Sequence, residues 1–266
     1  MKFFIALFFM ANITYANNHF NKVVTIIFEN TSFESAKKNL YFQDLARKGT
    51  LFTHFSAISH PSLPNYIAMI AGSTFSITND DNYNLDSKHL GDLLEDKKLD
   101  WRVYAEDYPG NCFLGSSYKK YARKHVPFLS FTNITKDSKR CEKIKNLNSF
   151  IEDLNKSKLQ TYSMIVPNLD NDGHDTGILF ASEWLKNFFD PLKLPDDLLL
   201  IITFDEGMGK NNSIYTLFIG KMIKKNFESN LDLNHYSILK LIEDNFALSS
   251  LHREDERAKN IENIWN

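Results

Sequence analysis

The sequence predicts an α/β fold in which a central, mostly parallel sheet is covered by helices on both faces. Short apolar runs rich in β-branched residues recur along the chain, and stretches with helical periodicity lie between them. No internal repeat and no Gly/Ser- or Pro-rich linker divides the chain, so we expect one domain over residues 17–266. With 266 residues, 43% of them apolar, the chain can bury a sizeable core, which excludes a disordered or collagen-like protein.

The individual elements follow from these runs. Apolar, strand-like runs predict strands at 23–28, 101–105, 162–166, 198–204 and 214–219. Helical periodicity predicts helices at 34–48, 67–71, 88–96, 178–189 and 235–246, and Gly49 and Gly72 end the first two. From Leu251 onward the chain is charged, and we expect a peripheral tail or helix there.

Residues 1–16 have the pattern of a secretory signal. Lys2 is followed by an apolar run over 3–11, and small residues stand at Thr14 and Ala16, which predicts cleavage after Ala16. An N-terminal strand or a membrane anchor is the alternative, but the run is shorter than the roughly 20 residues of a spanning helix. We therefore expect an exported protein, periplasmic or secreted, with no transmembrane anchor in the mature chain.

The charge balance argues against a nucleic-acid partner. The chain has 31 Lys and Arg against 33 Asp and Glu, a net charge of −2. A dedicated nucleic-acid binder normally carries a strong basic excess or a basic stripe.

The chain has two cysteines, Cys112 and Cys141. In an oxidising compartment such a pair predicts a disulfide. A nucleophilic cysteine is the alternative, but no histidine near either one in the sequence supplies a partner.

Acidic residues follow three of the predicted strands. Glu29-Asn30 follows the first, Asp170 stands shortly after the strand at 162–166, and Asp205-Glu206 follows the strand at 198–204. Ligands of open α/β sheets bind at the carboxyl ends of strands. Acids gathered there would repel one another unless a cation lay among them. The alternative is that each acid simply begins a surface loop.

The types of these donors indicate which ions would bind. Glu29, Asn30, Asp205 and Glu206 offer oxygen atoms, which suit calcium, magnesium or manganese. Asp170 and His174 stand four residues apart in a turn, and His235 opens the final predicted helix. One carboxylate with two imidazoles suits zinc, iron or manganese. We expect one or two divalent ions per chain.

Ser62 lies at the start of the helix that contains residues 67–71. Pro64 is tolerated in a first helical turn, so Ser62 falls at or beside the N-cap, where the helix dipole favours negative charge. A helix N-terminus together with a metal ion would make this hydroxyl a nucleophile. A plain capping serine is the alternative.

The order of motifs along the chain resembles that of a known family. Residues 28–34 (F-E-N-T-S-F-E) are similar to the E-N-x-S-F-[DE] signature of secreted phosphoesterases, which include bacterial and fungal acid phosphatases and C-type phospholipases. The resemblance covers nearly the whole mature chain and implies an alkaline-phosphatase-like fold, in which a Ser or Thr at a helix N-terminus attacks phosphorus beside one or two metal ions. The further motifs follow at His60–Tyr66, Tyr104–Gly110, Lys124–Phe128, Pro167–Asp175, Phe204–Gly207 and His235–Asp244.

The resemblance also implies roles for single residues. Ser62 is the nucleophile and itself contacts a metal ion, which Glu29, Asn30, Asp205 and Glu206 also bind. Asp170, His174 and His235 match the second metal position of the superfamily, or else contact the phosphate directly.

Further residues are candidates for contact with the substrate. Asn82 falls where related nucleotide phosphodiesterases place an amide on a phosphate oxygen. His60 stands two residues before Ser62 and is a candidate to protonate the leaving group, with a structural role as the alternative. Lys124 and His125 are candidates to hold phosphate charge, or form a solvated basic turn. The family's Lys-His-Asn-Pro is Lys-His-Val-Pro here, so the hydrogen bond of that Asn is absent.

These observations predict an exported, metal-dependent phosphoesterase, an acid phosphatase that acts on phosphomonoesters through a phosphoserine. The first alternative is a phospholipase C or phosphodiesterase that acts on lipid head groups, and the second is a non-catalytic metal-binding exported protein. The expected partner is therefore a small phosphate ester or a phospholipid head group.

Overall fold

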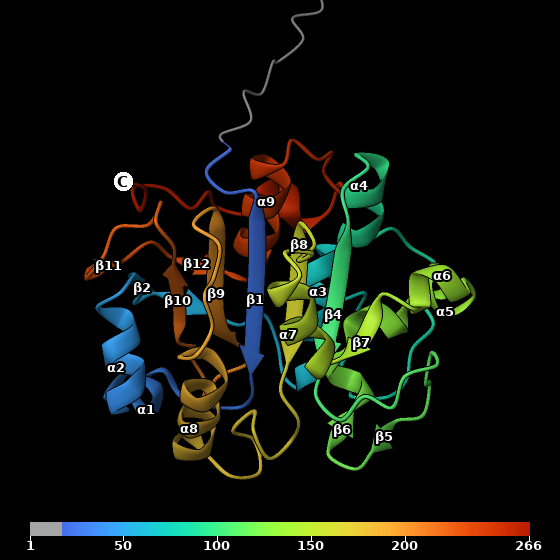
Figure 1. The fold of residues 1–266 in the computed structure, drawn as a ribbon, viewed down its shortest axis with the longest axis horizontal. Coiled ribbons are helices and arrows are strands. Elements are labelled where there is room, and N and C mark those ends of the chain that lie inside the picture. Colours follow the sequence, from blue (N-terminus) through green and yellow to red (C-terminus); the bar gives the residue numbers. More distant parts are fainter. Residues whose placement is uncertain (1–17) are drawn as a thin grey trace, which may run out of the picture.

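An eight-stranded sheet runs through the centre of the protein, which we describe from a computed structural model that covers residues 18–266 (Figure 1). The strand order is β11-β2-β10-β9-β1-β8-β4-β7. β10 is antiparallel to both of its neighbours, and every other neighbouring pair is parallel. The strands are β1 (Lys22–Phe28), β2 (Thr50–Phe52), β4 (Trp101–Ala105), β7 (Ile144–Asn146), β8 (Tyr162–Val166), β9 (Leu198–Phe204), β10 (Thr216–Ile219) and β11 (Phe227–Ser229).

The predicted mostly parallel sheet is confirmed, and its central strands lie where the apolar runs are. β1 lies between β8 and β9, with Val23 beside Tyr162 and Ile26 beside Ile202. All seven residues of β9 are buried, which explains why this run shows no polar alternation. The run at 214–219 does form a strand, but only from Thr216 and in the antiparallel direction. The three-residue strands β2, β7 and β11 escaped the sequence analysis because they are too short to show a period.

Helices cover both faces of the sheet (Figure 1). Long helices fall where periodicity predicted them, and short elements fill the connections. Two-stranded pairs form from β3 (Phe55–Ser56) with β12 (Leu233–Asn234) and from β5 (Ser117–Tyr118) with β6 (Tyr121–Ala122). The helices are α1 (Phe33–Lys38), α2 (Leu40–Ala46), α3 (Ser62–Ala71), α4 (Leu90–Asp96), α5 (Thr132–Thr135), α6 (Ser138–Cys141), α7 (Asn148–Asn155), α8 (Ile178–Phe189), α9 (His235–Asn245) and α10 (Glu254–Arg257), with 3₁₀ turns at Arg123–His125 and Pro127–Ser130.

The helix predicted over 34–48 is two helices that meet at Asn39. The backbone of Asn39 is extended, and its side-chain oxygen accepts hydrogen bonds from the N–H groups of Tyr41 and Phe42. Its amide also donates to Ser182 Oγ on α8 at 3.0 Å. Asn39 therefore caps a new helix, while the apolar period continues across the break and hides it in the sequence.

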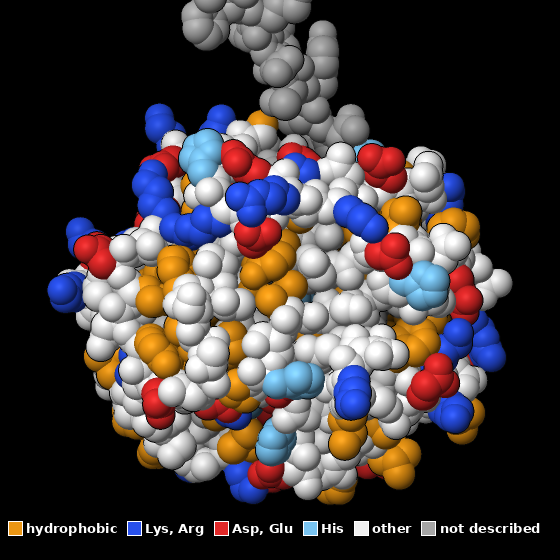
Figure 2. Space-filling view, turned by 180° about the vertical axis from the view of Figure 1, so that it is seen from behind, with side chains coloured by type: hydrophobic (Ala, Val, Ile, Leu, Met, Phe, Trp, Pro, Cys, Tyr) orange, Lys and Arg blue, Asp and Glu red, His pale blue; other side chains and the backbone are white. Residues whose placement is uncertain are grey.

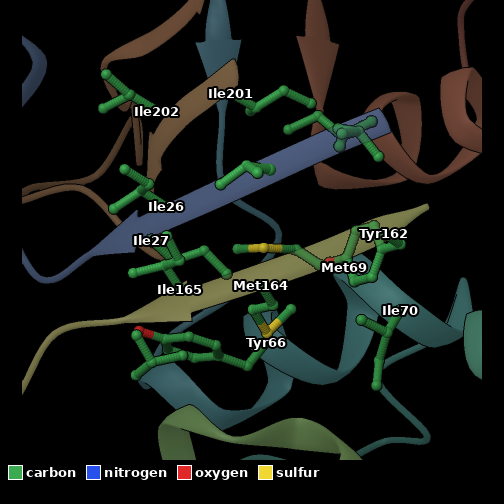
Figure 3. Packing of buried hydrophobic residues seen from close by; sticks show 14 of the residues in the cluster. Ile26, Ile27, Tyr66, Met69, Ile70, Tyr162, Met164, Ile165, Ile201 and Ile202 are labelled. Carbon is green, nitrogen blue, oxygen red and sulfur yellow. The ribbon is translucent and has the colours of Figure 1, made fainter. Parts of the chain in front are cut away.

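α3 is buried along its whole length and fixes the position of Ser62. Tyr66, Met69 and Ile70 face β1 and β8 in the core (Figure 3). The helix ends at Gly72, whose φ of 63° is left-handed, and a Cβ there would lie 2.5 Å from Asp255 Oδ1. Ser62 is the first helical residue, with Pro61 at the N-cap.

The segment after Leu251 forms a short helix, α10, which was one of the two expected alternatives, but it packs into the fold instead of lying at the periphery. Asp255 of α10 is fully buried and accepts hydrogen bonds from the N–H groups of Leu251 and Arg253. Ile261 and Ile264 are also buried. Two apolar residues among charged and polar ones are too few to establish a period.

The predicted disulfide is confirmed: Cys112 is bonded to Cys141, with 5.5 Å between the Cα atoms. The bond links the segment after β4 to α6. The predicted leader at 1–16 lies outside the described residues. Between residues 18 and 266, no helix has both the length and the apolar character needed to cross a membrane. Acidic and basic side chains are interspersed on the face shown in Figure 2.

Candidate active site

The carboxyl ends of β1 and β9 place four of the predicted residues side by side. The Asp205 N–H donates to the carbonyl of Phe28 at 2.9 Å, so the β1–β9 ladder continues past both strands. The Asn30 N–H lies 3.3 Å from Asp205 Oδ1. Glu29, Asn30, Asp205 and Glu206 therefore meet at one edge of the sheet, as predicted from their positions after two parallel strands.

Ser62 points its hydroxyl into this group of acids. Ser62 Oγ is 3.0 Å from Glu29 Oε2 and 3.4 Å from Glu206 Oε1. The side chain is buried, with 1% of its surface exposed. A buried hydroxyl between two carboxylates, at the first residue of a ten-residue helix, combines a proton acceptor with a helix N-terminus.

His60 reaches the same group from the solvent side. Its Nδ1 contacts Glu206 Oε2, and about half of its side chain is exposed. Glu206 therefore lies between Ser62 and His60, and His60 is open to an incoming ligand.

Burial disfavours the ionised forms of Glu29 and Asp205 when no cation is bound. It raises the pKa of Glu29 to about 7, although hydrogen bonds from Tyr66 and Ser62 oppose the shift. The pKa of Asp205 is raised well above its ordinary value, first by burial and then by the charges of Glu29 and Glu206.

The chemistry of these donors fits a divalent cation. Asp205 Oδ2 is buried and has no hydrogen-bond partner among residues 18–266, which is unusual for a carboxylate oxygen. A cation would satisfy this atom and keep its neighbours ionised. Within residues 18–266, however, no three His, Cys, Asp or Glu side chains form a ready-made metal cage. Glu206 is turned toward His60, and Glu29 toward Tyr66 and His125.

The residues predicted for a second metal position do not come together. Asp170 lies at the surface and pairs with Lys120 at 2.7 Å. His174 is exposed, and its Nδ1 lies 2.8 Å from Asp175. His235 is fully buried, and its Nε2 lies 2.6 Å from the carbonyl oxygen of Asp205. His235 therefore supports the backbone of the candidate site. Asp170 is drawn to Lys120, whereas His174 lies near enough for its charge to lower the pKa of Glu29.

The three residues predicted to hold phosphate differ in their exposure and in their contacts. Asn82 is exposed and donates to Ser116 Oγ at 2.7 Å. Lys124 Nζ donates to Asp80 Oδ2 at 2.7 Å, and the charges of Asp80 and Glu29 raise the pKa of Lys124 against the opposing effect of burial. His125 is buried rather than part of a solvated turn.

His125 packs against Glu29 and Tyr66 on the buried side of the candidate site. Its Nε2 lies 3.1 Å from Glu29 Oε1, and its ring stacks on Tyr66 with 5.1 Å between the centroids. Burial and the charge of Lys124 hold the pKa of His125 well below its usual value, so the ring is neutral. This buried position indicates a supporting role for His125 and not a direct contact with phosphate.

Comparison with known proteins identifies the family to which the chain belongs. A profile of the Phosphoesterase family matches residues 31–249, which begin directly after Asn30 and include Ser62, Asp205 and Glu206. The chain belongs to the Phosphoesterase family.

Relatives of this phosphoesterase chain include acid phosphatases. It is 36% identical to the phosphate-repressible acid phosphatase of Penicillium chrysogenum, over 89% of this chain and 61% of that protein. It is 32% identical to the phosphatidylinositol-3-phosphatase of Mycobacterium tuberculosis, over 86% of this chain and 78% of that protein. The chain spans about 60% of the length of the fungal acid phosphatases that it matches.

Solved structures show that the phosphoesterase chain has an alkaline-phosphatase-like fold. A protein of the alkaline phosphatase superfamily from Vibrio parahaemolyticus matches with a TM-score of 0.62 at 13% identity, over 91% of this chain and 71% of that one. The murine ectonucleotide pyrophosphatase/phosphodiesterase 5 matches with a TM-score of 0.55 at 10% identity, over 88% of this chain and 96% of that one. At these identities the likeness concerns the fold alone.

Three residues that contact the phosphoesterase site escaped the sequence analysis. The Tyr66 hydroxyl donates to Glu29 Oε1 at 2.7 Å, and its place four residues after Ser62 on one helix was a usable signal. Asp172 is buried, its carbonyl accepts from the Glu29 N–H, and burial raises its pKa to about 8. Asp80 accepts from the Leu63 N–H at 2.9 Å, and no local pattern indicates this contact.

Proposed function

We propose that this chain is an exported, metal-dependent phosphoesterase of the acid phosphatase kind, which hydrolyses phosphomonoesters through a phosphoserine on Ser62. The observation that carries the proposal is the 3.0 Å contact from Ser62 Oγ to Glu29 Oε2 at the start of α3. A hydroxyl in this position has a proton acceptor within reach, and the helix N-terminus favours the charge that develops on it. The names of the fungal relatives support a phosphomonoester as substrate.

The residues that would hold the metal ion are Glu29, Asn30, Asp205 and Glu206. Their oxygen donors suit calcium, magnesium or manganese, and zinc is compatible with carboxylates as well. A bound divalent cation supplies positive charge that offsets the charge on the hydroxyl and on the phosphate. The pairing of Asp170 with Lys120, and of His174 with Asp175, supports one such site rather than two.

Two displacements follow from the positions of the side chains. In the first, Ser62 Oγ transfers its proton to Glu29 Oε2 and forms a bond to phosphorus, while the ester P–O bond breaks. The leaving oxygen takes a proton from protonated His60, which is exposed beside Glu206. In the second, neutral His60 takes a proton from a water molecule, the water oxygen bonds to phosphorus, and the P–Oγ bond breaks. Glu29 then returns the proton to Ser62.

Capture of the phosphoryl group tests this proposal. Glycerol added to the assay should compete with water for the phosphoserine, so glycerol phosphate should form in proportion to the glycerol concentration. Acid-quenched protein should carry phosphate on the peptide that contains Ser62. The proposal fails if neither product appears while the ester is hydrolysed.

Export is part of the proposal and rests on two observations. Residues 1–16 have the composition of a secretory signal, and Cys112 is bonded to Cys141. A periplasmic or secreted protein would keep this bond.

One observation favours a second candidate, hydrolysis at phospholipid head groups by a phospholipase C or phosphodiesterase activity. Five of the six exposed large hydrophobic side chains between residues 18 and 266 lie on segments that follow the carboxyl ends of β4, β8 and β9. Hydrophobic side chains are visible along the lower border in Figure 2, at the same end of the molecule. Faster hydrolysis of a lipid phosphate in vesicles than of a soluble ester would support this candidate. The five residues are Leu114, Tyr118, Leu179, Phe180 and Met208.

A further inference from the structure

Asp80 holds two hydrogen-bond donors beside the candidate nucleophile. Its Oδ1 accepts from the Leu63 N–H at 2.9 Å, and its Oδ2 accepts from Lys124 Nζ at 2.7 Å. Leu63 is the residue directly after Ser62. Asp80 comes from the loop between α3 and α4, so the contact joins separate segments around the start of α3.

The same two donors are suited to a phosphoryl oxygen. A free N–H group in the first turn of a helix and a lysine ammonium are common phosphate ligands. Pro61 at the N-cap makes no side-chain hydrogen bond to this turn, so the Leu63 N–H receives its acceptor from Asp80. A phosphoryl group on Ser62 Oγ would lie next to this N–H, because the two residues are consecutive.

Lys124 also lies within range of the charges of the site. The carboxylates of Glu29 and Asp205, together with Asp80, favour its charged form. About a quarter of the Lys124 side chain is exposed, as is a similar share of Asp80. Because both side chains are partly exposed, another anion can reach the ammonium and take the place of Asp80.

We propose that Asp80 is a specificity-determining residue that competes with phosphate for the Leu63 N–H and the Lys124 ammonium. Substrate takes one or both donors from Asp80 when it binds, and Asp80 recovers them when inorganic phosphate leaves. This inference rests on the proposed function, because it assumes that phosphate binds at Ser62. It assigns Asp80 a role in affinity and product release rather than in the bond-breaking steps.

A positioning role for Asp80 would have the opposite effect on binding. If Asp80 only held Lys124 in place for the substrate, its removal would weaken the binding of phosphate. If Asp80 competes, its removal strengthens that binding. Asp80→Asn distinguishes the two, because Asn keeps the shape and can still accept the Leu63 N–H while it loses the negative charge.

The test is a calorimetric titration of the intact chain with inorganic phosphate. Asp80→Asn should bind phosphate about three- to tenfold more tightly than the unsubstituted protein, as expected for the loss of one partly exposed competing charge. In turnover, KM and kcat should both fall, because product leaves more slowly. Asp81→Asn is the matched control, since this neighbour is exposed and has the same charge, and it should leave the affinity unchanged.

A second substitution keeps the test decisive. In an Asp80→Asn/Lys124→Met double variant the gain in affinity should disappear, because the released ammonium is gone. Weaker or unchanged phosphate binding in folded Asp80→Asn would overturn the inference. Tighter binding by a chain that hydrolyses no ester would instead leave this inference standing and refute the proposed function.

Discussion

Ser62 Oγ and Glu29 Oε2 lie 3.0 Å apart, although 33 residues separate them in the sequence. Glu29 directly follows the central strand β1, and Ser62 is the first residue of the buried helix α3. A rigid sheet and a rigid helix therefore hold the hydroxyl and its proton acceptor in one arrangement. This pair is the basis of the proposed chemistry, and the predictions below test its surroundings.

Tyr66 should matter for catalysis because its hydroxyl holds the other oxygen of Glu29. Tyr66→Phe keeps the ring that stacks on His125 but removes a hydrogen bond to a carboxylate, so we expect kcat to fall about tenfold or more. Tyr215→Phe is the matched control: it removes a buried hydroxyl bonded to the Phe42 carbonyl and should leave kcat unchanged. Equal kcat values for both variants would contradict the role of Tyr66.

A divalent cation should bind at Asp205 and not at Asp170. A ligand that binds only the folded state stabilises it, so added cation should raise the melting temperature of the protein. Asp205→Asn should abolish this rise and lower the metal content, whereas Asp170→Asn should change neither, because Asp170 pairs with Lys120 at the surface. A chelator should abolish turnover, and full activity of the metal-free chain would refute metal dependence.

The turn after β8 contains one aspartate that the sequence predicted to lie at the site and one that it did not. Asp170 and Asp172 stand in the same turn, and the sequence favoured Asp170 for its spacing to His174. In the structure it is Asp172 that contacts the candidate site, because its backbone carbonyl accepts a hydrogen bond from the Glu29 N–H. Asp170 instead pairs with Lys120, which lies between β5 and β6. Strand ends could be predicted because the signal is local, whereas partners from distant segments, such as Asp80 for Leu63, could not.

Glu243 should make the protein less stable as the pH rises. Burial, and then the charges of Asp255 and Asp244, raise its pKa to about 9, and its Oε1 has no partner. Between an unfolded pKa of 4.5 and this value, the unfolded state releases a proton that the folded state keeps, so the free energy of unfolding falls.

Glu243→Gln tests this relationship in urea unfolding at two pH values. The variant should gain up to about 3 kcal/mol over the unsubstituted protein at pH 7, and much less near pH 4. Glu183→Gln, an exposed glutamate on α8 whose charge is not among those that act on Glu243, is the control and should show little change with pH. A Glu243→Gln gain of equal size at both pH values would show that burial of the charge is not the cause.

The bond between Cys112 and Cys141 should stabilise the fold. The residues are 29 positions apart, and closing such a loop contributes about 3 kcal/mol on the chain-entropy account. Replacing both cysteines by Ala should lower the free energy of unfolding by about this amount, measured in urea. Reaction of the native, unreduced protein with a thiol reagent would show that the bond is absent.

The stereochemical course at phosphorus tests the attack by Ser62 most directly. The substrate is a phosphate monoester made chiral with oxygen isotopes, and the phosphoryl group is transferred to an alcohol acceptor so that the product stays chiral. Two successive in-line displacements, the first by Ser62 and the second by the acceptor, each invert phosphorus, so we predict net retention. Net inversion would mean that the acceptor attacks directly and that Ser62 serves only as the first residue of α3.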